Sequence, residues 1–523
     1  MTGARIVPIL LLLAATASLA ATARAQATKP RARPAQTTIV DASQRIDINN
    51  ISMVVSNHGW FAYDEFTGSA GLEFPKGSFK TAVYASGLWL GAIGDGSVRV
   101  TVAEYSSDYR PGAAPGGVPD DPNLPRHKVY KLNRLYPDGS GGIDVAARDA
   151  ALADYNAGAV PSGAPVVPVQ GDGALGILGD QMLWSVYNDL GKGPAHNRAG
   201  SVLPLGIEVQ QTTWAYDRAM PTGYAVFTRF KLVNRGALNL TDMHVGFWAD
   251  ADLGGFNDDL AGCDTTLGLG FCYNATNNDQ MYGTKPPAVG FKMLQGPYST
   301  ALAARLPLTA FFVYPNGSDP QDSLSTFRFM HGLDKFGNPI LDPGSQPTRY
   351  MFSGDPVTAQ GWLDPTPSDR RFLLASGPFT MAPGDMQEVV LAILLARASD
   401  RLSSLSLLEA QVPIVQAAFD ADTLDLLDVP GAPAAALSLA PPWPNPAHGA
   451  ISLSISLPSE GEATVELVDV AGRRVFRQSL GHLAPGPHAI PLQAFREPRA
   501  AGIYFVRLTH HGTSVAQRLV HLP

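Results

Sequence analysis

Short runs of alternating apolar and polar residues, separated by clusters of glycine and proline, recur along most of the chain. The 523 residues include 52 glycines and 43 prolines, so turns are frequent. Parallel strands need crossover connections of a dozen or more residues, usually helices, and the sequence lacks a series of such helices. The pattern therefore predicts a mainly β fold, with an antiparallel β-sandwich body, a few short helices and a smaller C-terminal β-sandwich.

The segment 224–234 shows the strand pattern clearly. Val226, Phe230 and Leu232 fall on one face, and Arg229 and Lys231 fall on the other, as a half-exposed antiparallel strand requires. The residues Gly94-Asp95-Gly96 predict a hairpin turn, because Gly and Asp tolerate positive φ. Similar runs predict further strands at 81–92, 97–105, 128–135, 205–216, 243–248, 288–293, 308–314, 371–376 and 387–397.

Two segments have helical character. A helix is expected at 145–155, and a second begins at Ser399 or Asp400, either of which is a good N-cap. Leu402, Leu405, Leu408 and Val412 fall near one face of this later helix, and Pro413 is expected to kink or restart it. Composition shifts divide the chain into a signal peptide (1–25), a flexible linker (26–45), an N-terminal β-rich region (46–201), a second β-rich region with an acidic loop and the late helix (202–428), a Pro/Ala-rich linker (429–446) and a terminal domain (438–523).

The first 25 residues have the three parts of a secretory signal: a basic residue at Arg5, an apolar stretch from 6 to 21, and the small-x-small site Ala23-Arg24-Ala25. Cleavage is expected before Gln26. An uncleaved membrane anchor is the alternative, but the stretch is shorter than the ~20 apolar residues that a bilayer needs. We expect no transmembrane segment in the mature chain.

The charge of the chain argues against a nucleic-acid partner. The formal net charge is −8, and it becomes −10 once Arg5 and Arg24 leave with the signal peptide. No segment concentrates the basic residues that a phosphate backbone requires.

The terminal domain carries the most specific motifs. Six short strands are expected at 451–457, 463–469, 474–480, 488–492, 503–509 and 515–521. The order of signals, with Pro444-Asn445-Pro446 before the first strand, the hairpin 467–473, Pro485-Gly486 and the late strand 502–508, resembles the type IX secretion C-terminal sorting domain and the flagellar hook-capping-type Ig-like domain. Asp469 and Gly472 suit the hairpin turn on their own merits, since the turn needs a side-chain acceptor and a residue free in φ.

That resemblance implies an Ig-like β-sandwich that sorts or attaches an exported protein, a secreted or cell-surface location, and the secretion machinery and outer-membrane surface as partners. A purely structural domain is the alternative. Between 178 and 297 the phrases LGDQMLWSVYND and GFWADADLGGFNDD resemble uncharacterised secreted bacterial proteins with the same terminal domain, and this second resemblance implies no activity.

An acidic loop follows the strand at 243–248. Asp250, Asp252, Asp258, Asp259 and Asp264 offer hard oxygen ligands among glycines, which favours a structural Ca²⁺ site. It is not an EF-hand, because position 12 is Ala261 and no helices flank the loop. A solvated acidic turn, with Asp side chains capping backbone amides, is the alternative.

The only two cysteines, Cys263 and Cys272, stand close together in an exported chain, where a disulfide is permitted. We expect a disulfide, with two buried free thiols as the alternative.

The sequence shows no catalytic signature. The 11 histidines give no H-E-x-x-H spacing, and no G-x-S-x-G or phosphate-binding loop occurs. Acids suited to glycoside hydrolysis exist at Glu65, Glu73, Glu104 and Glu208, but such acids are common in β-rich chains. A row of aromatic residues could form a ligand platform, although such rings more often anchor a core: Trp60, Phe61, Tyr63, Trp89 and Trp184. We therefore expect a non-enzymatic surface or extracellular protein, with a secreted hydrolase or an adhesin that binds a glycan or a protein as alternatives.

Overall fold

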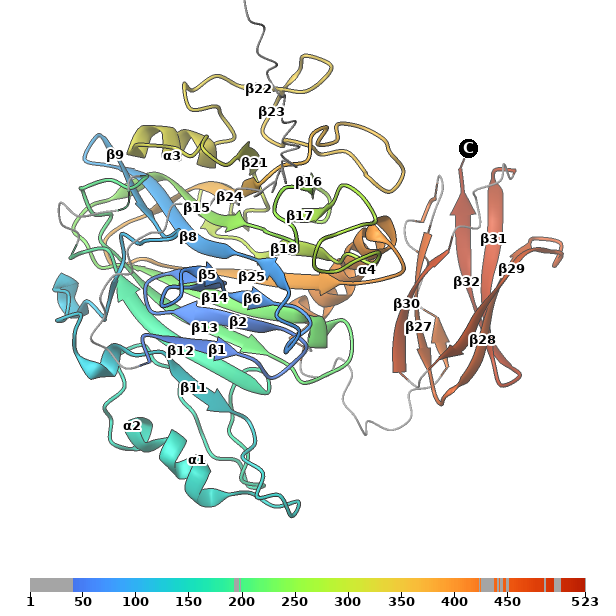
Figure 1. Ribbon diagram of the computed structural model, residues 1–523, viewed down its shortest axis with the longest axis horizontal. Helices are drawn as coiled ribbons and strands as arrows, with labels where there is room; N and C mark the ends of the chain where they lie inside the picture. Colours follow the sequence, from blue (N-terminus) through green and yellow to red (C-terminus); the bar gives the residue numbers. More distant parts are fainter. Residues whose placement is uncertain are drawn as a thin grey trace, which may run out of the picture.

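The computed structural model describes residues 41–191, 197, 199–422, 424, 437–439, 442, 445–447, 451–483, 486–492 and 500–522. The predicted signal peptide at 1–25 and most of the predicted linkers at 26–45 and 429–446 lie outside these residues. Within them the chain is mainly β and its ladders are antiparallel, as predicted (Figure 1).

A first sheet of the body runs in the order β21-β24-β15-β8-β3-β2-β6-β7, with β1 beside β2 and β9 beside β8. The turn between β8 and β9 is the predicted one, because Gly94 pairs with Ser97 and both Asp95 and Gly96 have positive φ. The strands of this sheet are β1 (Ser43–Ile46), β2 (Ser52–Ser56), β3 (Trp60–Phe61), β6 (Leu72–Glu73), β7 (Thr81–Val83), β8 (Ala85–Gly94), β9 (Ser97–Val102), β15 (Leu240–Asp250), β21 (Ala310–Pro315) and β24 (Arg370–Met381).

A second sheet runs in the order β10-β12-β13-β14-β25-β18-β17-β16, with β11 beside β12. Its strands are β10 (Arg110–Pro111), β11 (Tyr130–Asn133), β12 (Gln181–Asn188), β13 (Ile207–Ala215), β14 (Ala225–Asn234), β16 (Asp259–Asp264), β17 (Leu269–Asn274), β18 (Ala288–Gln295) and β25 (Met386–Ala396). Both sheets contain strands from the two predicted β-rich regions, 46–201 and 202–428.

The two sheets pack face to face around one hydrophobic core. On β14 the predicted apolar face is buried, and the Phe230 ring lies 5.3 Å from the Phe247 ring of β15. Phe291 of β18 lies 5.3 Å from Phe372 of β24 in the same way. A single cluster of buried side chains, from Ile46 to Leu395, joins the sheets, so the body is the predicted β-sandwich.

The outer face of the second sheet is covered by α4 (Arg401–Asp420). Asp400 is the N-cap, and its carboxylate accepts from Leu402 N and Ser403 N at 3.0 Å. The expected restart at Pro413 is wrong, because the helix continues through that residue to Asp420. By length and composition α4 could span a membrane, but Leu405, Leu408 and Val412 are buried against the second sheet.

Smaller elements decorate the sandwich. The helix expected at 145–155 forms as α1 (Val145–Ala151) and α2 (Ala153–Asn156), whereas α3 (Ser323–Met330), with Asp322 as its N-cap, has no counterpart among the predictions. The remaining elements are the pairs β4 (Tyr63–Asp64) with β5 (Ser69–Ala70), β19 (Tyr298–Ser299) with β20 (Ala304–Arg305) and β22 (Ile340–Leu341) with β23 (Pro347–Thr348), and the turns η1 (Pro115–Gly117), η2 (Pro125–His127) and η3 (Thr222–Tyr224).

The C-terminal module is a second sandwich with its own core (Figure 1). One sheet runs β26-β27-β30 and the other runs β29-β28-β31-β32. Buried residues from both sheets form a hydrophobic cluster that is separate from that of the body. The strands are β26 (Ser438–Leu439), β27 (Ile451–Leu457), β28 (Gly461–Asp469), β29 (Arg474–Leu483), β30 (Gly486–Leu492), β31 (Gly502–His510) and β32 (Thr513–His521).

Candidate functional site

The predicted acidic loop leaves the first sheet at the end of β15 and enters the second at the start of β16. Asp250 is the last residue of β15, where it pairs with Arg371 of β24 and with Ala85 of β8. Asp259 is the first residue of β16 and Asp264 is the last. The five predicted ligands are thus spread over a strand, a loop and a second strand, and they do not converge on one point.

Two of the predicted ligands, Asp250 and Asp252, meet a third carboxylate, that of Asp369. All three side chains are buried, and one oxygen from each lies within 4.8 Å of the others. Asp369 stands just before β24, more than 100 positions further along the chain, and the pairing of β24 with β15 brings it to this end of the first sheet. Three buried carboxylates this close repel one another unless a cation or a proton lies among them.

The guanidinium of Arg371 is the protein's own cation in this cluster. Its Nη1 donates to Asp369 Oδ1 at 3.3 Å, its Nε lies 3.4 Å from Asp319 Oδ1, and its Nη2 lies 3.8 Å from Asp250 Oδ2. Burial alone lowers the pKa of Arg371, but the surrounding carboxylates, with Asp250 first, raise it above its ordinary value. Arg371 therefore stays charged.

Three carboxylates contact this guanidinium, and that of Asp252 lies close to two of them. A cation bound among these buried carboxylates would add to the positive charge that Arg371 supplies. The donor set consists of carboxylate oxygens alone, and such hard oxygens fit Ca²⁺.

Asp258 and Asp259 form a second acidic group with Asp279. Asp279 is a turn anchor, because it accepts from Gly255 N at 2.7 Å and from Met281 N at 2.8 Å. Asp259 Oδ2 accepts from Leu253 N at 3.0 Å. Burial raises the pKa of Asp259 well above its ordinary value, and the charges of Asp252, Asp258 and Asp279 raise it further. The pKa of Asp258 is raised as well, first by burial and then by the charge of Asp279.

Asp264 has a different role from the one predicted. Its Oδ1 accepts from Thr266 N at 2.8 Å and Leu267 N at 2.9 Å, so it caps the turn between β16 and β17. It stands five residues along β16 from Asp259, about 16 Å at the usual rise per strand residue. Here the alternative of an Asp that caps backbone amides describes the residue.

The expected disulfide is a wrong prediction, because both cysteines are buried free thiols. On the β16–β17 ladder Cys263 lies opposite Gly270 and Cys272 lies opposite Ala261. Such diagonal positions are about 7–8 Å apart, beyond the Cα separation that a disulfide spans. Instead, the Cys263 thiol lies 3.5 Å from Met351 O and the Cys272 thiol lies 3.7 Å from Ala251 O.

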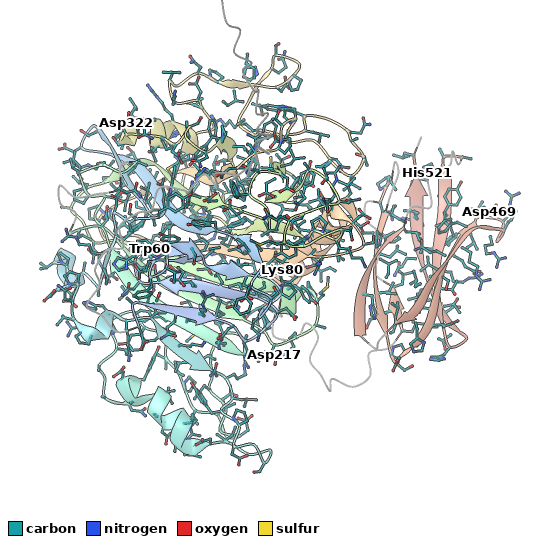
Figure 2. All side chains as sticks on the ribbon, in the orientation of Figure 1. Trp60, Lys80, Asp217, Asp322, Asp469 and His521 are labelled. Carbon is teal, nitrogen blue, oxygen red and sulfur yellow. The ribbon has the colours of Figure 1, made fainter. Side chains whose placement is uncertain are left out.

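The aromatic residues that could have formed a ligand platform are core anchors. Each is at most 3% exposed, as the interior position of Trp60 in Figure 2 illustrates: Trp60, Phe61, Tyr63, Trp89 and Trp184. Of the four acids weighed for hydrolysis, Glu65, Glu104 and Glu208 are buried in the body as well, whereas Glu73 on β6 is partly exposed. Glu208 accepts from Ala114 N at 2.7 Å and pairs with Arg235 at 3.0 Å. Glu65 and Glu104 are buried, and burial raises the pKa of Glu65 to about 7.

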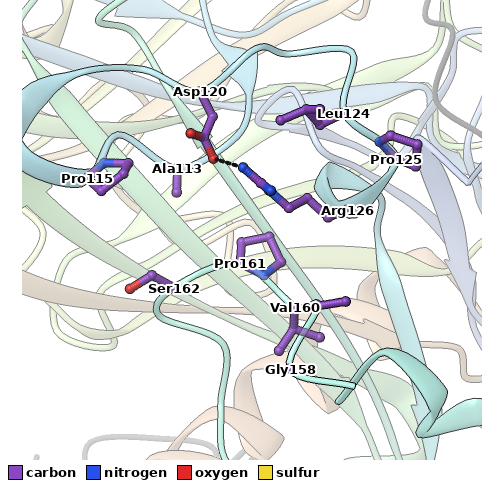
Figure 3. Close-up of a pocket in the computed structure, with 11 residues that line it drawn as sticks. Ala113, Pro115, Asp120, Leu124, Pro125, Arg126, Gly158, Val160, Pro161 and Ser162 are labelled. Carbon is purple, nitrogen blue, oxygen red and sulfur yellow. Dashed lines mark hydrogen bonds and ion pairs between the residues drawn. The ribbon is translucent and has the colours of Figure 1, made fainter. Parts of the chain in front are cut away.

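A surface pocket of about 420 Å³ opens between the segment 113–126 and the loop 158–162 (Figure 3). Three prolines line it, at positions 115, 125 and 161. Its two charged residues, Asp120 and Arg126, pair with each other across 2.9 Å. These lining residues offer neither a nucleophile with a base nor two separated carboxylates, so they do not support hydrolysis.

The C-terminal module presents its predicted turn at one tip (Figure 2). Asp469 Oδ1 accepts from Ala471 N at 3.0 Å and from Arg473 N at 2.9 Å, and Gly472 has a φ of +78°. The predicted roles of Asp469 and Gly472 are therefore confirmed. On β31, Tyr504 and Val506 face the core of the module while Phe505 and Arg507 face outward.

Comparison with known families indicates a function for this module. Residues 442–521 match the family described as a secretion system C-terminal sorting domain. No curated protein matches the chain. The sorting domain marks a protein that type IX secretion delivers to the cell surface or the extracellular space, and it implies contact with the secretion machinery. The chain is thus a secreted, surface-targeted protein.

The sequence did not identify Asp319, Asp369, Arg371 or Tyr105 as members of the acidic cluster. Tyr105 donates to Asp250 and accepts from Arg371 at 2.9 Å. The run Asp369-Arg370-Arg371 at the start of a predicted strand was the available signal, because charges at a strand end need partners.

Proposed function

We propose that this chain is a non-enzymatic protein of the bacterial cell surface, exported to the periplasm by the signal peptide at 1–25 and then sorted and attached through its C-terminal module. The observation that carries the proposal is the family match at 442–521, which falls on a sandwich with its own hydrophobic core. A module that folds independently can serve as an export signal without help from the body. The likeness of this module to the hook-capping-type Ig-like domain stays a prediction.

The outer face of the four-stranded sheet supports a docking role for the module. Arg507 pairs in register with Glu466, and Phe505 pairs with Arg518 in the neighbouring row. Phe505 is 39% exposed and Ile503 is 44% exposed, so apolar and basic groups lie side by side on this face. Such a mixed surface suits recognition by another protein.

The experiment compares full-length protein with a chain that lacks 438–523. We expect the truncated body to accumulate folded in the periplasm, since its core lies within the body sheets. Conversely, a reporter that carries the signal peptide and residues 438–523 should reach the surface. The matched control is the same reporter with Leu467→Ala, which disrupts the module's core. Unchanged export of the truncated chain, or no export of the intact reporter, would contradict the proposal.

We also propose that Asp250, Asp252 and Asp369 hold a structural Ca²⁺. The convergence of these three buried carboxylates supports this site, and the ion would tie the end of β15 to the start of β24. It would also keep these carboxylates ionised, because metal binding displaces protons from its ligands. The proposed role of the ion is structural.

Calorimetry with CaCl₂ tests the site. The wild type should bind Ca²⁺, and Asp250→Asn/Asp252→Asn should lose binding by at least about tenfold. Asp264→Asn is the control, because this carboxylate caps the β16–β17 turn, and it should bind as the wild type does. The absence of binding heat in the wild type would overturn the calcium site and leave the sorting role intact.

A further inference from the structure

A second cluster of potential ligands lies where β15 begins and α3 ends. It consists of Asp242 and His244 on β15 and His331, the C-cap residue of α3. One ligand atom from each lies within 4.8 Å of the others. Neither the sorting role nor the calcium site uses these residues, and none of the sequence motifs pointed to them.

His331 faces two acceptors, one with each ring nitrogen. Its Nδ1 lies 2.8 Å from the carbonyl oxygen of Phe327, and its Nε2 lies 3.1 Å and 3.2 Å from the two oxygens of Asp242. A neutral imidazole has one N–H, so it satisfies only one of these contacts. With Nδ1 donating to the carbonyl, the lone pair of Nε2 faces the Asp242 carboxylate, and a metal ion bound to both groups fits this arrangement.

His244 forms the buried wall of the cluster. It is 2% exposed, its ring centre lies 3.9 Å from that of His331, and its Nδ1 lies 3.8 Å from Asp242 Oδ1 and 3.0 Å from the Asp242 carbonyl oxygen. Gly377 of β24 packs against the ring so closely that a Cβ there would lie 2.4 Å from it.

We propose that Asp242, His244 and His331 bind one divalent transition-metal ion of the Zn²⁺ type. Imidazole nitrogens favour Zn²⁺, Cu²⁺ and Ni²⁺ over Ca²⁺ and Mg²⁺. In a tetrahedral site with metal–ligand bonds of about 2.0–2.1 Å, ligand atoms are about 3.3 Å apart. Asp242 Oδ2 lies 3.1 Å from His331 Nε2, and Asp242 Oδ1 lies 3.8 Å from His244 Nδ1, so both oxygens of the carboxylate are near a ring nitrogen at a separation of this order. Three protein ligands leave a fourth position for water.

The cluster is open enough for an ion to enter. The side chain of His331 is 21% exposed and that of Asp242 is 36% exposed, whereas His244 lies beneath them. Bound there, the ion would connect the C-terminal end of α3 to β15. Arg349, an exposed residue whose charge reaches His244, opposes a cation at this place. Arg349 therefore repels a cation bound at this site, and removing its charge tests whether the affinity for the cation rises.

Calorimetric titration of the full chain with ZnCl₂ tests the proposal, and Co²⁺ absorption gives a second readout of the ligand geometry. We expect one equivalent of Zn²⁺ to bind, with a loss of at least about tenfold in His331→Ala and in Asp242→Asn. Asn tolerates the positive φ of position 242, so the second variant preserves the backbone. Arg349→Gln should bind more tightly than the wild type.

The matched control is His482→Ala. His482 pairs with Glu460 at 3.0 Å, both side chains are exposed, and the pair belongs to the C-terminal module, whereas the three proposed ligands belong to the body. This variant should bind as the wild type does. Circular dichroism shows that each variant is folded. If the wild type takes up no Zn²⁺, or if His331→Ala and Asp242→Asn bind as tightly as the wild type, the cluster is an ion pair bridged by a proton and the proposal fails.

Discussion

Arg371 donates a 2.9 Å hydrogen bond to the phenolic oxygen of Tyr105, which stands 266 positions earlier in the chain. Tyr105 in turn donates to Asp250, so the three side chains form one buried network. The network joins the segment after β9, the end of β15 and the start of β24 at one end of the first sheet. In this network the positive charge of Arg371 lies close to three buried carboxylates, those of Asp250, Asp319 and Asp369.

Replacing Arg371 by Met should therefore destabilise the body strongly. The substitution removes the guanidinium and leaves Asp250, Asp319 and Asp369 buried without it. Breaking a buried ion pair on one side costs about 3–5 kcal/mol. Urea unfolding followed by tryptophan fluorescence measures the change, since five tryptophans of the body are buried: Trp60, Trp89, Trp184, Trp214 and Trp248.

The control for this prediction is Arg126→Met. Arg126 also contacts a carboxylate, Asp120 at 2.9 Å, but its side chain is 46% exposed. Exposed ion pairs contribute about 0–1 kcal/mol, so this variant should unfold near the wild-type midpoint. Equal losses in the two variants would contradict the assignment of a special role to Arg371.

The two thiols should be present and unreactive in the native protein. Burial raises the pKa of Cys263 and of Cys272, and the thiolate is the reactive form. A thiol reagent such as Ellman's should react slowly with the folded chain and should report two thiols per chain in denaturant without reductant. No reactive thiol after denaturation would show that the exported protein carries the disulfide that the structure lacks.

The contribution of His58 to the stability of the body should be lost as the pH falls from 6.5 towards 4. His58 is 8% exposed and stacks on Trp60, and burial lowers its pKa from 6.5 to about 4. Because the folded pKa lies below the unfolded one, the unfolded chain takes up a proton first. The stability that neutral His58 contributes is complete above pH 6.5 and is lost through pH 4, up to about 3 kcal/mol.

His58→Phe isolates this contribution, because Phe keeps the stacking on Trp60 and does not titrate. The free energies of unfolding of the two proteins should run parallel above pH 7. Below pH 6.5 the free energy of unfolding of the wild type should fall more steeply than that of His58→Phe. Glu65 titrates with the opposite sign, since burial raises its pKa to about 7, but it is common to both proteins. Identical pH profiles would rule out His58 as a source of acid sensitivity.

The elements that the sequence predicted well are those with local signals. Adjacent residues determine the turn at Gly94-Asp95-Gly96. Neighbouring residues also determine the alternation of Val226 and Phe230 with Arg229, and the structure contains both features as predicted. The helix does not restart at Pro413, because the packing of Leu408 and Val412 on the second sheet outweighs the loss of one helical hydrogen bond. Tertiary packing decides such a case, and it is not visible in the local sequence.

The acidic site was only half predictable for the same reason. Asp250 ends β15 and Asp252 stands two residues further on, a spacing that directs both side chains to the same side of an extended backbone. Their partner Asp369 and their counter-charge Arg371 arrive through the β15–β24 ladder, whose register the sequence does not state. The predicted disulfide was wrong because Cys272 stands two positions away from the residue opposite Cys263 on the β16–β17 ladder. The spacing of the two cysteines in the sequence does not give this register.

The C-terminal module should unfold as a unit of its own. Leu467 of β28 is fully buried in the hydrophobic cluster of the module, which contains no residue of the body. Leu467→Ala removes buried methyl groups and should cost the module about 2–5 kcal/mol. Phe505→Ala is the matched control, since Phe505 lies on the outer face and is 39% exposed. Calorimetry should show a transition that Leu467→Ala lowers and Phe505→Ala leaves nearly unchanged, beside a body transition that neither variant moves. A joint shift of both transitions in Leu467→Ala would mean that body and module unfold together, and would remove the physical basis for a module that acts as a self-contained sorting signal.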